Sequence, residues 1–139
     1  MAVGLSIVGA LGFATFVAAT GNPRSTLYIT LGELRSRAAE SLEIARGSAA
    51  SRLTPNFVRA QTAQLAPRIA SLRDALADAE TNDGGADART ARPLSERLLA
   101  LTQQLGERAE APSAAAPIAH ELSAIVERLV PLARSARPG

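Results

Sequence analysis

The sequence contains no cysteine and no tryptophan, and it has one histidine and one tyrosine among its 139 residues. Without cysteine the chain has no disulfide framework, no zinc ribbon and no catalytic thiol. A single imidazole and 3% aromatic residues leave little for general base chemistry or for stacking on nucleic-acid bases. We therefore expect a protein that is not an enzyme and does not bind nucleic acid.

Lysine is also absent, so all 15 basic residues are arginine, set against 13 acidic residues. The calculated pI of 10.3 reflects this use of arginine, because the net charge is only +2. A nucleic-acid interface needs arginines clustered on one face, whereas here they alternate with acids, as in Arg37, Glu40, Glu43 and Arg46. This pattern is typical of a solvated surface of mixed charge.

No residue from Met1 to Pro23 carries a charged side chain. As a helix this segment would be about 34 Å long, which covers the roughly 30 Å hydrocarbon core of a bilayer. The sequence therefore predicts a transmembrane anchor over residues 1–23, followed by a second domain over 24–139. A cleaved signal peptide is disfavoured by the missing charged start, and a buried helix of a soluble bundle by the missing polar face.

Small residues recur at every fourth position of the predicted anchor. They form a strip on which another membrane helix could pack closely, although alanine-rich composition also produces such spacing. The strip comprises Ala2, Ser6, Ala10, Ala14 and Ala18. Arg24, Arg35 and Arg37 follow the segment, so the positive-inside rule favours the cytoplasmic side for the second domain.

The second domain shows leucine and isoleucine residues at alternating steps of three and four, which predicts helices with coiled-coil-like seams. We expect the first of four helices from Pro23 to near Gly47 and a second from Thr54-Pro55, with a kink at Pro67. The next loop is expected to run from Thr81 to about Thr90. The predicted seams comprise Leu27, Leu31 and Leu34; Leu65, Ile69, Leu72 and Leu76; Leu94, Leu98, Leu101 and Leu105; and Ile118, Leu122, Ile125 and Leu129.

No segment has the alternation of a strand, so the predicted fold is all-α: a transmembrane helix followed by an antiparallel four-helix bundle. Ser113 is a plausible cap for the last helix. Alanine-rich stripes bury less area than leucine stripes, which leaves open paired helical hairpins that complete their core with another subunit.

Candidate chemical sites are few. His120-Glu121 does not continue into the H-E-x-x-H zinc motif, because position 124 is alanine. The acid pairs Asp74 with Asp78, and Asp83 with Asp87, lack the ligand number of a calcium loop. We predict no catalytic, cofactor or metal site.

These observations favour a structural or accessory subunit of a larger membrane assembly or a homo-oligomer, with partners among membrane lipids, other membrane subunits or itself. No specific small molecule is predicted as a partner. Two alternatives remain: a sensory or ligand-binding bundle with a site near Pro67, and a soluble amphipathic protein that coats apolar surfaces. Tyr28, just beyond the uncharged segment, suits either a position at the lipid headgroups or packing between helices.

Overall fold

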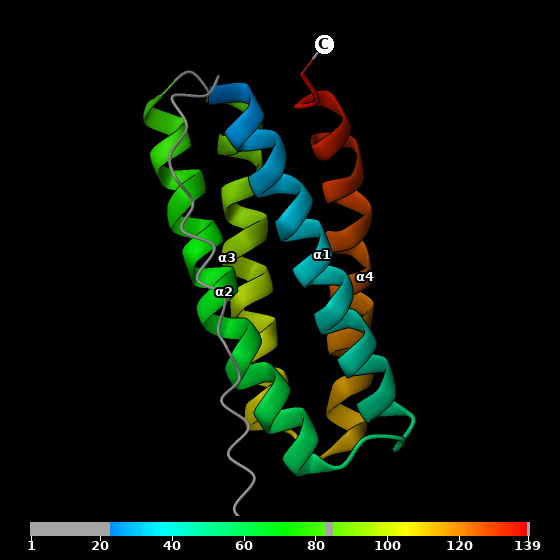
Figure 1. Cartoon of the computed structure of the whole chain (residues 1–139). Helices are drawn as coiled ribbons and strands as arrows, with labels where there is room; N and C mark the ends of the chain where they lie inside the picture. The colour runs from blue at the N-terminus through cyan, green and yellow to red at the C-terminus, as the bar shows by residue number, and fades with distance from the viewer. Residues whose placement is uncertain (1–22, 83–84, 139) are drawn as a thin grey trace, which may run out of the picture.

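The computed structural model describes residues 23–82 and 85–138, and this part of the chain forms four helices and no strands. The helices are α1 (Pro23–Ala49), α2 (Pro55–Thr81), α3 (Gly85–Glu107) and α4 (Pro112–Ser135). They run antiparallel in sequence order around one interior (Figure 1). The prediction of an all-α helical bundle is confirmed for these residues.

The four helices pack most extensively in two pairs, α1 with α4 and α2 with α3. The start of α1, the end of α2, the start of α3 and the end of α4 all lie at one end of the bundle, which we call the Pro23 end (Figure 1). The opposite end, the Pro55 end, holds the connections from α1 to α2 and from α3 to α4. Ion pairs agree with this register, since Arg92 meets Glu80 near the Pro23 end and Arg59 meets Glu110 at the other.

The core is closed by one chain. The structure buries all twelve predicted seam residues of α2, α3 and α4, with at most 8% of any of them exposed. On α1 the stripe of Leu27, Leu31, Leu34, Ala38 and Ala45 is buried in the same cluster. These residues meet inside a single four-helix bundle, so the alternative of paired hairpins that need a second subunit for their core does not describe this fold.

The start signal Thr54-Pro55 has its expected effect on α2, and Pro67 does not end the helix. The hydroxyl of Thr54 accepts a hydrogen bond from the backbone N–H of Phe57 at 3.2 Å, and Pro55 occupies the first turn. Pro67 lies inside one continuous helix and is exposed, as is Ala63 one turn earlier. The carbonyl group that loses its helical partner at Pro67 therefore lies on a face that water can reach.

Two predicted boundaries are wrong. The loop expected to run to about Thr90 ends before α3 begins at Gly85, and Ala88 and Ala91 are completely buried. These alanines extend the stripe of Leu94 toward the start of the helix, but their small side chains give a weak hydrophobic signal. Ser113 does not cap α4: Ala111 occupies the cap position without a side-chain hydrogen bond, and Pro112 begins the helix, for which its fixed φ is suited.

Two helical glycines occupy different surroundings. A Cβ atom on Gly106 of α3 would clash with the hydroxyl of Thr62 on α2 and lie 3.3 Å from the Cβ of Thr62. A Cβ atom on Gly32 of α1 would have no other atom within 4 Å. Gly106 therefore sets how closely α2 and α3 approach, whereas Gly32 only weakens its helix.

We predict that Gly32→Ala raises the free energy of unfolding by up to about 1 kcal/mol, the difference in helix propensity between the two residues. Gly106→Ala is expected to lower it by about 1 to 3 kcal/mol, because the added methyl group overpacks the α2–α3 interface. Urea unfolding of the full chain in mild detergent, followed by circular dichroism, measures both. Equal changes for the two variants would contradict the assigned packing.

Candidate functional site

Residues 1–22 of the predicted anchor lie outside the residues that the structure describes, and so do the five small residues of its packing strip, from Ala2 to Ala18, whereas Pro23 begins α1. Among α1 to α4, no helix combines the length and apolar character that crossing a membrane requires. Candidate sites in the described part therefore belong to the bundle.

The bundle interior contains buried hydroxyl groups: Thr62 occupies a seam position in the sequence pattern, whereas the pattern did not single out Ser41 or Thr102. Ser41 of α1 and Thr102 of α3 are completely buried, and their hydroxyl oxygens lie 2.9 Å apart in a hydrogen bond across the bundle. The buried hydroxyl of Thr62 donates to the carbonyl oxygen of Val58 at 2.8 Å. These inward polar groups satisfy one another or their own helix, and Pro67, near which a ligand was considered, faces outward.

We predict that Thr102→Val lowers the free energy of unfolding by about 1 to 3 kcal/mol, because it leaves the buried Ser41 hydroxyl without its partner. Adding Ser41→Ala should restore part of the loss, since it removes the unsatisfied group. The exposed Thr90→Val change is the control and should shift stability by less than about 0.5 kcal/mol. Additive losses in the double variant, measured by urea unfolding, would argue against the hydrogen bond.

The residues considered for metal or acid-base chemistry lie apart. His120 is exposed, Asp74 pairs with the neighbouring Arg73 at 3.1 Å, and Asp87 accepts a hydrogen bond from Ser135 at 3.3 Å. Asp83 lies outside the described residues. Within residues 23–82 and 85–138, no three histidine or acidic side chains gather where they could hold a metal ion.

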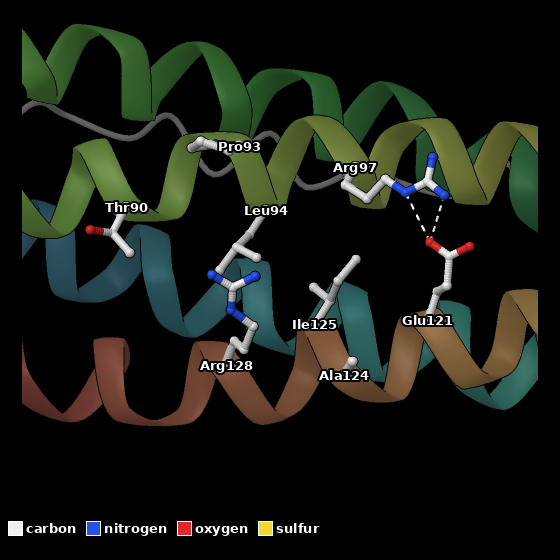
Figure 2. A pocket seen from close by; sticks show the side chains of 8 residues that line it. All are labelled: Thr90, Pro93, Leu94, Arg97, Glu121, Ala124, Ile125 and Arg128. Atoms are coloured by element: carbon white, nitrogen blue, oxygen red, sulfur yellow. Dashed lines mark hydrogen bonds and ion pairs between the residues drawn. The ribbon is translucent and has the colours of Figure 1, made fainter.

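An open groove of about 500 Å³ runs between α3 and α4. Figure 2 shows its lining side chains, which come from both helices, with Leu94 of α3 opposite Arg128 of α4 and Arg97 of α3 opposite Glu121 of α4. We call it the α3–α4 groove. It is lined by Thr90, Pro93, Leu94, Arg97, Glu121, Ala124, Ile125 and Arg128.

Charges stand at two places along this groove. The guanidinium group of Arg97 donates through Nε, at 3.0 Å, and through Nη2 to the same carboxylate oxygen of Glu121, and both side chains are about half exposed. Arg128 rises from α4 toward Leu94 of α3 (Figure 2), and no carboxylate of the described residues forms an ion pair with it. The groove thus combines an apolar base at Leu94 and Ile125 with the guanidinium group of Arg128, which is available to a partner.

A second hollow of about 260 Å³ lies between α1 and α4 toward the Pro23 end, and we call it the basic hollow. It forms where Gly32 and Ala133 leave space between larger neighbours. Its lining comprises Tyr28, Ile29, Gly32, Arg35, Ala133, Arg134 and Arg137. Sequence reasoning singled out Tyr28 and noted Arg35, but it missed Arg134 and Arg137, which lie about a hundred residues further along the chain and reach α1 only through the antiparallel fold.

None of the three arginines of the basic hollow forms an ion pair with an acid of the described residues. Arg37, one turn along from Glu33 and close to Glu40, shows the contrast, since it pairs with both at 3.7 and 2.8 Å. The basic hollow therefore concentrates positive charge that no ion pair with the described acidic residues neutralises.

Comparison of the chain with models of protein families, with curated proteins and with solved structures found no match. The features that bear on function are the uncharged segment of the sequence, the α3–α4 groove and the basic hollow. The α3–α4 groove and the basic hollow use different pairs of helices, with α4 contributing to both.

Proposed function

We propose that the protein is a membrane-tethered accessory subunit, in which residues 1–23 form the membrane anchor and the helical bundle contacts another subunit of the same assembly. One observation carries the proposal: the first 23 residues have no charged side chain, and the last of them, Pro23, begins the first helix of a bundle that closes its own core. The length suits a bilayer, and the sequence joins the segment to the Pro23 end.

The closed core favours this function over a buried role for the uncharged segment. Four amphipathic stripes already cover one another within residues 23–138, so the bundle does not need a fifth apolar helix to fill its interior. An apolar segment left outside such a core finds a suitable environment in lipid. The small-residue strip from Ala2 to Ala18 would then be available to a neighbouring membrane helix.

The α3–α4 groove supports the second part of the proposal. Leu94 and Ile125, each 5% exposed, form the base of the groove, and the exposed Pro93 and Ala124 extend its apolar lining. Arg128 adds a cation without an acidic partner among the described residues. An amphipathic helix docks into such a groove through its apolar face. The partner that fits is a helix of another subunit with an apolar stripe and a carboxylate placed opposite Arg128.

We predict that the full-length protein stays in the membrane fraction after a carbonate wash. Val8→Arg combined with Leu11→Arg should release it, because each arginine at the centre of a membrane helix costs about 2.5 to 3.5 kcal/mol. Gln64→Arg combined with Gln103→Arg adds the same charge to exposed bundle positions and should leave it membrane-bound. Release of the unchanged protein, or a mature mass lacking the first residues, would overturn the anchor.

The partner contact is tested on the same membranes by mild detergent extraction and native mass analysis. Arg128→Glu should dissociate a defined complex, since it reverses the charge that meets the partner carboxylate. Arg108→Glu is the matched control at the Pro55 end, and it should leave the complex intact. If the complex tolerates both changes, the partner does not use the α3–α4 groove.

A further inference from the structure

We propose that the basic hollow binds the phosphate group of an anionic membrane lipid, so that the bundle leans its α1–α4 edge on the bilayer. This inference rests on the proposed membrane tether. It adds a ligand, a surface and an orientation that tethering alone does not supply.

The basic hollow carries concentrated positive charge. Arg35, Arg134 and Arg137 converge on one hollow of about 260 Å³, and no described acid forms an ion pair with them. Guanidinium groups bind phosphate oxygens through paired hydrogen bonds, and arginines near a membrane surface are attracted to anionic lipids. The small side chains at Gly32 and Ala133 leave room for a group to enter between the arginines.

The basic hollow combines this charge with exposed apolar surface. Tyr28 is 37% exposed and Ile29 is 50% exposed, and both line the basic hollow beside the arginines. At a membrane surface, tyrosine is enriched at the headgroup level, and an exposed isoleucine finds apolar lipid groups there. Free phosphate would explain the arginines, but it would not use these two side chains.

The residues of the basic hollow on α1 lie at different distances from the start of the helix at Pro23. Tyr28 follows Pro23 by five residues, which is about 8 Å along a helix, and Arg35 lies about 18 Å along it. An upright bundle would hold Arg35 beyond the headgroups, whereas a bundle that leans on the α1–α4 edge brings the whole hollow to them. In the sequence Gly21-Asn22-Pro23, Asn22 can cap a new helix that starts at Pro23, so the sequence predicts a break or bend there, and such a bend permits this angle.

Glu33 lies on α1 next to Gly32 of the hollow and pairs with Arg37 at 3.7 Å, whereas two other acids near the Pro23 end lie on α2, which does not line the basic hollow. Asp78 and Glu80 belong to α2, and Glu80 is paired with Arg92 at 3.3 Å. Asp87, in the first turn of α3, accepts a hydrogen bond from Ser135 of α4 and forms no ion pair with the arginines of the hollow. A bundle that leans on α1 and α4 therefore presents three arginines without a carboxylate partner to the lipid, and it keeps the carboxylates of α2 away from it.

The chain contains no tryptophan, so Tyr28→Trp gives a single fluorophore at the rim of the hollow. The full-length Y28W protein is reconstituted in vesicles of neutral phosphatidylcholine, with or without anionic phosphatidylglycerol. A phosphatidylcholine that carries a nitroxide on its headgroup quenches the fluorescence. We expect a blue-shifted emission and stronger quenching when the anionic lipid is present, and we expect high salt to weaken both effects.

Adding Arg134→Gln and Arg137→Gln to Y28W should abolish the difference between the two lipid mixtures. The matched control, Arg52→Gln with Arg108→Gln, removes the same charge from exposed positions at the Pro55 end and should preserve it. Equal quenching in neutral and anionic vesicles would overturn the lipid site. So would loss of the difference on adding inorganic phosphate but not chloride of equal ionic strength, since the hollow would then prefer free phosphate.

A carbonate wash of the same vesicles separates this proposal from the tether. Protein that resists the wash but shows no response to anionic lipid keeps its anchor and overturns the lipid site. Protein that the wash releases has no anchor, yet the lipid site stands if, before the wash, the protein floats with anionic vesicles and requires Arg134 and Arg137 to do so.

Discussion

Burial of four apolar stripes in one interior is the constraint on which the rest of this structure depends. Alanine supplies much of the apolar surface, so the helices must approach closely to bury enough area against the entropy of ordering the chain. Gly106 against Thr62 marks such a close approach between α2 and α3. The buried cluster of the described residues combines leucines and isoleucines with alanines and contains no aromatic residue.

Close packing in two strong pairs also shapes the surface. Because α1 packs mainly with α4 and α2 with α3, fewer residues of α3 and α4 contact each other. The α3–α4 groove lies where this packing is less extensive. The basic hollow arises from a local cause, the small residues Gly32 and Ala133 on a tightly packed pair of helices. Both surfaces thus follow from where the core is filled and where it is not.

The sequence was sufficient to predict the features that depend on local chemistry or strong periodicity. Thr54 and Pro55 marked the start of α2, and the leucine spacing marked the buried stripes. It was insufficient where alanine carried the stripe, as at Ala88 and Ala91, so the loop after Thr81 was predicted too long. The pair of Ser41 with Thr102, and the meeting of Arg35 with Arg134, depend on contacts between distant segments that no local pattern encodes.

In our proposal, residues 1–23 hold the bundle to a membrane, and the bundle rests there on the side that carries the basic hollow. The absence of cysteine permits a direct measurement. Single cysteines at Ile29, beside the hollow, and at Ala111, at the Pro55 end, each receive a nitroxide in the full chain reconstituted in anionic vesicles. Oxygen concentrates in lipid, so we expect the nitroxide at position 29 to collide with oxygen more often than the nitroxide at position 111. We expect the nitroxide at position 111 to collide more often with a water-soluble nickel complex. Equal access of the nickel complex to both positions would contradict the proposed orientation.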